Sequence, residues 1–250
     1  MASIAVENVT LHFPIIGVGD RSVKNTILNF ATGGKITKNS GTMLVTGLQD
    51  ISFCLQNGDR LGLIGHNGAG KSTLLKVLAG IYHPTQGAVT VQGRILSTLN
   101  ITLGFEQEAT GYENIILKGR LLGLNAKEIE SKVDEIAEFT ELGKYLNLPV
   151  RVYSSGMLIR LAFAVMTALE SDILLMDEVI GTGDARFIHK AEKRLNEFMN
   201  KAKIMVIASH SEAVIKEFCN RALLLKNGTL FAFGEVDEIL SIYQSDEYQN

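Results

Sequence analysis

Alternating apolar and polar positions predict β-strands in the first part of the chain. Residues 4–13 (IAVENVTLHF) alternate in this way, and strand character returns at 48–56 (LQDISFCLQ). The turn signal Asn-Gly-Asp at 57–59 predicts a hairpin between that segment and 60–64. A further β stretch is expected at 88–95. We therefore expect an antiparallel β subdomain near the N-terminus.

Helical patterns dominate residues 110–170. Asn125 and Glu128 have the spacing of a capping box, and the apolar stripe that follows predicts an amphipathic helix through Phe139. A second helix, over 158–169, is apolar on nearly every side and is expected to be buried. This part of the chain is therefore predicted to form a helical subdomain.

Two runs read as buried strands, at 172–178 (DILLMDE) and 203–210 (KIMVIASH), each bounded by helical sequence. A third run, RALLLKNG from residue 221, leads into a β-turn and a final helix near 235–244. Strands that alternate with helices predict a mostly parallel sheet and an α/β fold.

Composition narrows the classes of protein that fit. A chain of 250 residues with 46% apolar and 20% charged residues is ample for one large globular domain. The net charge of −3 argues against a broad nucleic-acid-binding surface. Cys54 and Cys219 lie far apart in apolar stretches, and we interpret them as reduced core residues.

The sequence also carries expectations about membranes. The first residues (MASIAVENVT) do not resemble a signal peptide, and no run approaches the roughly 18 apolar residues that span a bilayer. We therefore expect any role at a membrane to be that of a peripheral subunit.

A phosphate-binding motif occupies residues 65–72 (GHNGAGKS), which fit G-x-x-x-x-G-K-[ST] between a strand and a helix. Its glycines let backbone N–H groups face inward, and the next helix presents its positive end to phosphate. Lys71 can reach the β- and γ-phosphates, and the Ser72 hydroxyl can hold Mg²⁺. The plain alternative is a glycine-rich turn. The residues expected to bind ATP here are Gly65, His66, Asn67, Gly68, Ala69, Gly70, Lys71, Ser72 and Thr73.

Two adjacent acids end the first buried strand. Asp177 is suitably placed to hold Mg²⁺ beside the phosphate loop, and Glu178 can polarise the attacking water. The alternative is that both acids simply face solvent at a strand end. Next to a phosphate loop, the catalytic interpretation is the stronger one, and it assigns catalysis to Glu178 with Lys71.

These residues, with further segments, resemble the nucleotide-binding subunits of ABC transporters over essentially the entire chain. Tyr153-Ser154-Ser155-Gly156-Met157 stands where that family carries its L-S-G-G-Q signature. The resemblance implies that Ser154 and Gly156 face the γ-phosphate bound by a second copy, in trans. Taken alone, the segment would read as the start of a capped core helix.

Three single residues take roles from the same resemblance. His210 closes the second buried strand, where the family has a histidine that contacts the γ-phosphate and serves catalysis. Phe13 stands where an aromatic ring stacks on adenine, although it could equally be plain core. Asp184, in Gly-Thr-Gly-Asp, occupies the loop that crosses the dimer seam. A glutamine of the family that serves the metal site corresponds here to Gln107 or Glu108, and both stay open.

The implied fold is that of a P-loop NTPase of the ABC ATPase type. It has a RecA-like, mostly parallel sheet core, an N-terminal antiparallel β subdomain and an α-helical subdomain. Residues 1–250 would form a single nucleotide-binding domain, with 1–105 and 171–250 as core and β subdomain and 106–170 as helical subdomain; no C-terminal carbohydrate-binding domain is expected. ATP and Mg²⁺ are the implied cofactors. The implied partners are a second cassette, forming a homodimer, and two copies of a separate transmembrane permease, with no nucleic acid.

Within the family, the stretches YSSGM, GFEQEATGYENI and DEVIGTGDARF are similar to the subgroup that exports lipid-linked polysaccharides such as O-antigen. The resemblance implies an ATP hydrolase on the cytoplasmic face of the bacterial inner membrane. Three alternatives stay open: an exporter subunit for a different cargo, a soluble ABC ATPase acting on ribosomes or DNA, and an ATP sensor that does not hydrolyse. The joint presence of Lys71, Asp177, Glu178 and His210 speaks against the sensor.

Overall fold

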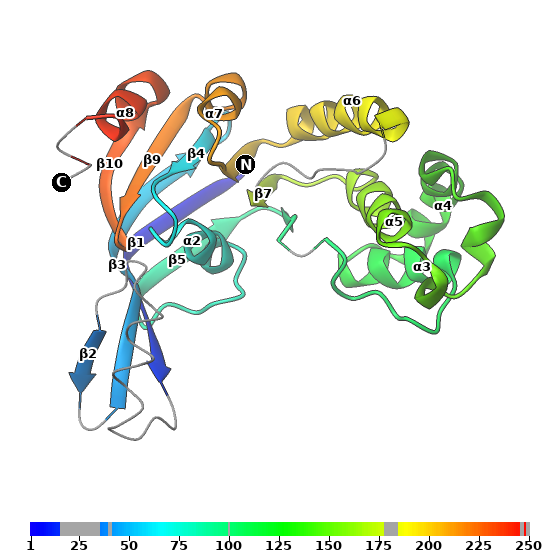
Figure 1. The fold of residues 1–250 in the computed structure, drawn as a ribbon, viewed down its shortest axis with the longest axis horizontal. Coiled ribbons are helices and arrows are strands. Elements are labelled where there is room, and N and C mark those ends of the chain that lie inside the picture. The colour runs from blue at the N-terminus through cyan, green and yellow to red at the C-terminus, as the bar shows by residue number, and fades with distance from the viewer. Residues whose placement is uncertain (16–35, 40–41, 100, 178–184, 246–247, 249–250) are drawn as a thin grey trace. The chain divides into compact units, whose positions relative to one another are not determined.

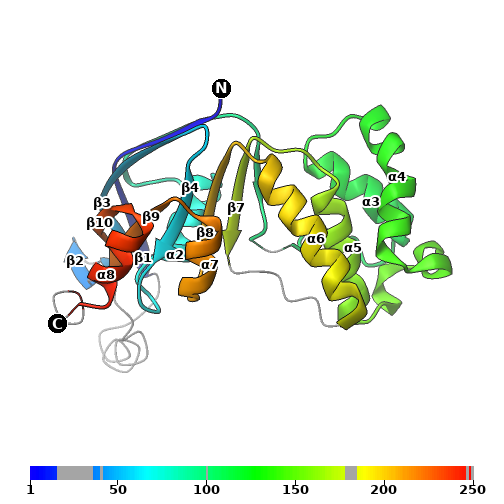
Figure 2. The ribbon, with the colours of Figure 1, turned by 90° about the horizontal axis from the view of Figure 1, so that it is seen from above.

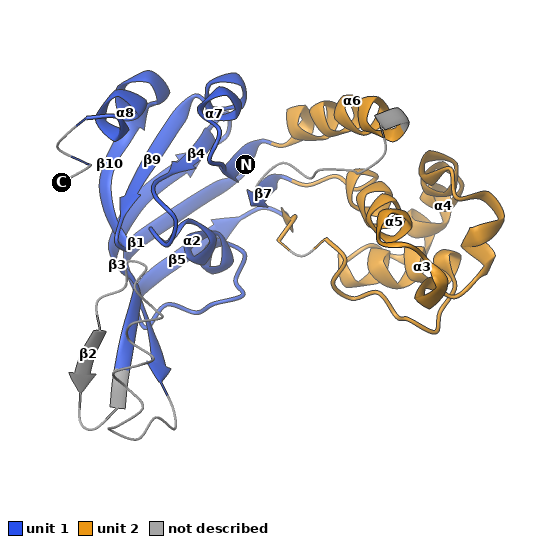
Figure 3. Ribbon diagram, viewed as in Figure 1, with its two compact units in different colours: residues 1–95, 172–179, 203–250 blue, residues 96–171, 180–202 orange. Residues whose placement is uncertain are grey.

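The computed structural model describes residues 1–15, 36–39, 42–99, 101–177, 185–245 and 248, and Figure 1 shows the ribbon. The chain divides into two compact units, coloured separately in Figure 3. The core unit consists of Met1–Ile95, Asp172–Val179 and Lys203–Asn250. The helical unit consists of Leu96–Ser171 and Ile180–Ala202. Each unit is described by itself below.

The core unit contains a four-stranded antiparallel sheet in the order β2-β3-β1-β5. Its strands are β1 (Ser3–Ile15), β2 (Ile36–Asn39), β3 (Thr42–Gln56) and β5 (Gln86–Gln92). The alternation predicted for β1 is present, since Ile4 and Val6 are buried between partly exposed neighbours. A bulge at Glu7 and Asn8 then shifts the register of β1 against both of its partners.

A second sheet has six strands in the order β10-β9-β4-β8-β7-β6. They are β4 (Arg60–Ile64), β6 (Ile95–Ser97), β7 (Ile173–Asp177), β8 (Ile204–Ala208), β9 (Arg221–Lys226) and β10 (Thr229–Glu235). The four strands β9, β4, β8 and β7 are parallel, and β10 pairs with β9 antiparallel. Their side chains are buried almost throughout, as expected for a parallel sheet covered on both faces.

Three helices complete the core unit, namely α2 (Lys71–Leu78), α7 (Glu212–Phe218) and α8 (Val236–Tyr243). Helix α2 packs between the two sheets, in contact with β7 and β8 on one side and with β3 and β5 on the other. Helices α7 and α8 pack together on the opposite face of the six-stranded sheet (Figures 1 and 2). The helix that follows the phosphate loop is therefore fixed on two sides.

Two predictions about this unit are wrong. The segments 48–56 and 60–64 do not form a hairpin, because β3 pairs with β1 and β2 while β4 pairs with β8 and β9 in the other sheet. A turn is present, since the Asp59 N–H donates to the Gln56 carbonyl oxygen at 3.0 Å, but the chain crosses there from one sheet to the other. Cys54 is exposed, because it alternates along β3 with the buried Phe53 and Leu55.

The helical unit contains α3 (Gly111–Leu121), α4 (Ala126–Thr140), α5 (Ser155–Thr167) and α6 (Ala185–Lys201), with 3₁₀ turns at Gly143–Asn147 and Val150–Val152. The capping box predicted at Asn125 and Glu128 is confirmed, with both reciprocal hydrogen bonds present. Helix α5 is buried from Leu161 onward, in agreement with its apolar sequence. None of the described helices combines the length and apolarity needed to cross a bilayer.

Three phenylalanine rings, Phe139, Phe163 and Phe187, form the centre of the helical unit and join α4, α5 and α6. Their centroids lie 5.5 to 6.3 Å apart, and Arg194 of α6 lies over the Phe139 ring at 4.5 Å. These contacts join α6 to α4 and α5 within the helical unit, which includes Ile180–Ala202.

Candidate functional site

The phosphate-binding motif connects the carboxyl end of β4 to the start of α2. Three of its glycines, Gly65, Gly68 and Gly70, have positive φ angles that side-chain-bearing residues rarely adopt. A Cβ atom on Gly65 would also lie 2.5 Å from the backbone oxygen of Leu225 at the end of β9. The glycine at this position is therefore required by close packing as well as by backbone conformation.

Two hydrogen bonds hold the phosphate loop to other parts of the core unit. The Gly228 N–H donates to the Ala69 carbonyl oxygen at 2.9 Å, and the His66 N–H donates to the hydroxyl of Tyr248 at 3.2 Å. On the other side, Asn67, Gly68 and Ser72 are exposed. The loop is therefore held by the core unit, and part of it remains exposed and open to a ligand.

Lys71 and the N-terminus of α2 supply positive charge at the phosphate loop. The Lys71 ammonium group donates to the carbonyl oxygens of Gly65 (2.6 Å) and His66 (3.1 Å), which holds the side chain folded back along the loop. The N-cap residue of α2 is Gly70, so no side chain caps the first N–H groups of the helix. These features fit the phosphates of a nucleotide.

The parallel register places the predicted acid and histidine at the same edge of the sheet. Ala208 of β8 lies opposite both Leu63 of β4 and Asp177 of β7. Asp177 is partly buried, and His210 is exposed two residues beyond Ala208. The edge that starts the phosphate loop therefore also carries a carboxylate and an imidazole, beside the exposed Ser72 hydroxyl. Glu178 and Asp184 lie outside the described residues.

These side chains fit a magnesium ion shared with a nucleotide. Among the described residues there is no group of three or more His, Cys, Asp or Glu side chains that could hold a metal on its own. Mg²⁺ usually takes one or two protein ligands and completes its shell with phosphate oxygens and waters. Ser72 and Asp177 match such a partial set, so they could hold Mg²⁺ only together with the phosphates.

An aromatic pair lies next to the loop. The ring of Phe13 meets that of Tyr82 edge-on at 5.3 Å, and a Cβ atom on Gly47 would lie 2.6 Å from the Phe13 ring. The same Gly47 position is 3.5 Å from the side chain of Thr73, so Phe13 lies near the first turn of α2. The sequence analysis singled out Phe13 and missed Tyr82, although an aromatic shortly after the α2 helix was a usable signal.

The signature segment starts a helix in the helical unit. Ser154 is the N-cap of α5, and its hydroxyl accepts a hydrogen bond from the Met157 N–H at 3.2 Å. Gly156 is exposed, and a Cβ atom there would have the Ser154 hydroxyl oxygen, at 3.9 Å, as its nearest neighbour among the described residues. The folding of this unit therefore does not itself demand a glycine at this position.

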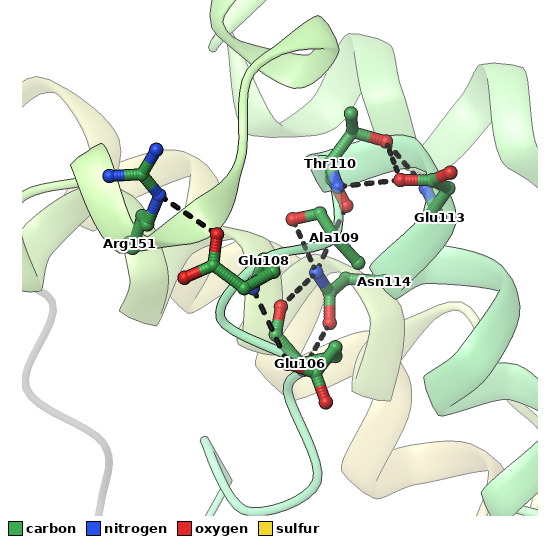
Figure 4. A network of polar contacts seen from close by, with 7 residues as sticks. All are labelled: Glu106, Glu108, Ala109, Thr110, Glu113, Asn114 and Arg151. Carbon is green, nitrogen blue, oxygen red and sulfur yellow. Dashed lines mark hydrogen bonds and ion pairs between the residues drawn. The ribbon is translucent and has the colours of Figure 1, made fainter.

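Gln107 and Glu108 lie in a short stretch that pairs with the segment leading into the signature. The Arg151 N–H donates to the Gln107 carbonyl oxygen at 3.1 Å, and the Val150 N–H donates to the Ala109 carbonyl oxygen at 3.0 Å. The Glu108 carboxylate forms an ion pair with the Arg151 guanidinium at 3.1 Å, as Figure 4 shows. Which of the two residues serves the metal site stays a prediction.

Asn114 fixes the same stretch from the other side and was missed by the sequence analysis. Its fully buried amide nitrogen donates to the carbonyl oxygens of Glu106, Ala109 and Thr110 at 3.0 to 3.1 Å, and its amide oxygen accepts from the Glu106 N–H at 2.8 Å (Figure 4). Thr110 also caps α3, and its N–H and hydroxyl lower the pKa of the Glu113 carboxyl. Hydrogen bonds therefore connect segment 106–110 to the first turn of α3.

Comparison with known proteins agrees with this geometry. Residues 48–181 match the family described as ABC transporter. The chain is 46% identical to the O-antigen export system ATP-binding protein RfbE of Yersinia enterocolitica, over 92% of this chain and 97% of that protein. It is 38% identical to the corresponding RfbB of Klebsiella pneumoniae, with 96% and 97% covered. It is also 40% identical to the teichoic acids export protein TagH of Lactococcus lactis, with 79% and 42% covered.

Solved structures show the same fold. An ATP-binding subunit of an ABC transporter superposes with a TM-score of 0.69 at 22% identity, covering 96% of this chain and 92% of that one. A dimeric ATP-binding cassette in a post-hydrolysis state with ADP and Pi gives 0.66 at 18% identity, with 93% and 98% covered. Because the family match spans more than half of the chain and the Yersinia relative is similar over nearly its whole length, this chain belongs to the ABC transporter family.

Proposed function

We propose that this chain is the ATP-binding and ATP-hydrolysing subunit of an ABC transporter that exports a lipid-linked polysaccharide of the O-antigen type. The observation that carries the ATPase proposal is the edge of the six-stranded sheet, where the phosphate loop follows β4, Asp177 ends β7 and His210 follows β8. The polysaccharide cargo is supported by the names of the relatives at 46% and 38% identity.

Within this proposal each residue of the candidate site has one role. The open backbone N–H groups of the loop and the Lys71 ammonium bind the phosphates, and Phe13 stacks on the adenine. Ser72 and Asp177 hold Mg²⁺, which neutralises phosphate charge when bound, and Gln107 or Glu108 would complete the metal site. Glu178 orients the attacking water, with help from His210.

We further propose that two copies close head to tail, with Asp184 at the seam. Ser154 and Gly156 of one copy would then face the γ-phosphate held by the other. The open space at Gly156 supports this proposal, because a glycine that its own unit does not need is explained by the close approach of another group. Hydrolysis would need the dimer because neither half-site alone surrounds the transition-state charge.

The site proposed for the permease is a cavity of about 460 Å³ in the helical unit, lined by Gly104, Phe105, Glu106, Leu117, Arg120 and Leu121. Leu121 is 68% exposed at its rim, and an apolar side chain so placed suits a protein partner. Lys118 contacts residues at this cavity, since its ammonium group donates to the Leu103 carbonyl oxygen and lies 5.6 Å from the ring of Phe105, which lines the cavity. Burial lowers the pKa of Lys118. Two permease copies, one for each cassette, would hold the pair at the inner face of the membrane as a peripheral ATPase.

The test is a host that lacks this gene, complemented with either the wild-type chain or the Lys71→Ala variant. We expect long undecaprenyl-linked polymers to accumulate in the cell and to disappear from the surface without the wild-type chain. Complementation by Lys71→Ala should leave that defect in place, because the phosphate loop then lacks its cation. A glycan profile unchanged by the deletion would contradict the proposed cargo.

A further inference from the structure

The aromatic side chain of Tyr248, beyond the last helix, is 5% exposed and packs against the core unit. Its ring lies 5.2 Å from that of Tyr243 and 5.5 Å from that of Phe231, and the Lys226 ammonium lies 5.3 Å from its centroid. The ring of His66, in the phosphate loop, lies 6.4 Å away. A residue far along the chain therefore belongs to the surroundings of the phosphate loop.

The Tyr248 hydroxyl makes two hydrogen bonds that join the loop to the sheet. It accepts the His66 N–H at 3.2 Å and donates to the Leu225 carbonyl oxygen at 2.9 Å. Both partners are backbone groups, so the bridge links the main chain of the loop to the main chain of β9. Burial raises the pKa of the Tyr248 phenol, and a phenol is protonated at neutral pH even at its ordinary pKa, so the hydroxyl can donate.

The Leu225 carbonyl oxygen is also the atom against which Gly65 packs. A Cβ atom on Gly65 would approach this oxygen to 2.5 Å. The first turn of the phosphate loop is therefore located by one carbonyl oxygen, which touches Gly65 directly and reaches His66 through the tyrosine hydroxyl. The Lys71 ammonium donates to the carbonyl oxygens of the same two residues, Gly65 and His66, so the first turn of the loop is held by Lys71 and by the tyrosine bridge together.

We propose that Tyr248 is a positioning residue of the nucleotide site, which holds the first turn of the phosphate loop in the form that binds phosphate. The proposal rests on the proposed ATP-binding function of the loop. A glycine-rich loop has many alternative conformations, and a ligand that selects one of them loses affinity in proportion to the freedom that it must remove. The hydroxyl bridge removes part of that freedom before the nucleotide arrives.

The experiment measures the affinity of the full chain for a fluorescent ADP analogue with Mg²⁺, in wild type and in Tyr248→Phe. Loss of one bridging hydroxyl should raise the Kd by about 3- to 10-fold, which corresponds to one or two hydrogen bonds. The KM for ATP should rise with it, while kcat at saturating ATP stays as in wild type. Tyr243→Phe is the matched control, because it removes a hydroxyl from the same aromatic cluster without touching the bridge, and it should bind like wild type.

Two further measurements separate the possible failures. Lys71→Ala must weaken binding by about 100-fold if the loop is the nucleotide site, and a wild-type chain that does not bind the analogue overturns the proposed function as well as this inference. An unchanged Kd in Tyr248→Phe, with binding weakened in Lys71→Ala, overturns the inference alone. A raised Kd that is accompanied by an equal loss of folded chain in circular dichroism also overturns it, since the residue would then be structural only.

Discussion

The two ends of the six-stranded sheet are built from the same parallel strands and are finished in opposite ways. At the amino end, side chains close the backbone: Asn220 accepts the Arg60 N–H and donates to the Gly58 carbonyl oxygen, both at 2.9 Å. Asp172 accepts the Arg94 N–H at 2.9 Å and the Lys203 ammonium at 2.6 Å. These contacts satisfy the strand ends from within the chain.

At the carboxyl end, hydrogen bonds hold part of the phosphate loop, while Asn67, Gly68 and Ser72 are exposed. The helix after it begins at Gly70 without a side-chain cap, which leaves N–H groups that a ligand can satisfy. The comparison teaches that one set of strands serves stability at one end and ligand binding at the other, as in other open α/β sheets. Substitutions at the amino end should therefore change mainly the stability of the fold, and substitutions at the carboxyl end mainly the affinity for nucleotide.

The largest difference between the effect on nucleotide affinity and the effect on stability is expected for Lys71→Ala. Removing the ammonium group should lower the affinity for Mg²⁺-ADP by about 100-fold, because charged hydrogen bonds to phosphate are lost. The free energy of unfolding should change by no more than about 2 kcal/mol, because two hydrogen bonds to loop carbonyl oxygens are lost as well. Isothermal titration and urea denaturation on the same preparation test both statements, with Lys216→Ala on α7 as an exposed lysine control in the same unit. A large loss of stability with retained nucleotide binding would contradict the assignment of ligand binding to the carboxyl end of the sheet.

The opposite behaviour is expected for Asn220→Ala. Two hydrogen bonds to backbone groups disappear, so the free energy of unfolding should fall by about 1 to 2 kcal/mol. The Kd for ADP should stay as in wild type, because the change is at the amino end of the sheet. Urea denaturation monitored by circular dichroism gives the first value. A parallel loss of nucleotide affinity would mean that the two ends are coupled.

Asp172→Asn should give a smaller effect that depends on pH. The Arg94 N–H, and then Lys203, hold the pKa of the Asp172 carboxyl below its usual value. Its charge therefore stabilises the fold above the pKa of the unfolded chain, and that contribution is lost as the pH falls through the lower pKa of the folded state. We expect the variant to be less stable by about 1 kcal/mol at pH 7 and equal to wild type near pH 2. A difference that does not shrink on acidification would contradict this origin.

Much of the architecture could be predicted because its signals are local. The capping box at Asn125, the alternation of β1 and the apolar runs of β7 and β8 depend on near neighbours in sequence, and all of them are present. The hairpin prediction was wrong because it also relied on a local signal. A turn at residues 57–59 makes a hairpin only if the two strands beside it pair in one sheet, and that pairing depends on residues far away in the sequence.

The residues of the candidate site likewise divide into those that have a local sequence signal and those that do not. Its phosphate loop and Asp177 were predictable, because a loop motif and an acid after a buried strand are sequence-local features. Tyr248 was not singled out, since it acts through the backbone of His66 and Leu225, which its own sequence neighbourhood does not reveal. Tyr82 and Asn114 were missed although each lies close in sequence to the element that it supports. The wrong placement of Cys54 shows the related limit, in that an apolar stretch does not say which face of the strand is covered.

The most direct test of the account is the mass of the Glu178→Gln variant with and without ATP, measured by size-exclusion chromatography with light scattering. The account predicts a species of 27.3 kDa without nucleotide and twice that mass with ATP and Mg²⁺, because ATP is bound but not hydrolysed between two copies. Adding Lys71→Ala to this variant should keep it at the single mass. A Glu178→Gln chain that binds ATP and stays at the single mass would contradict a site completed by a second copy.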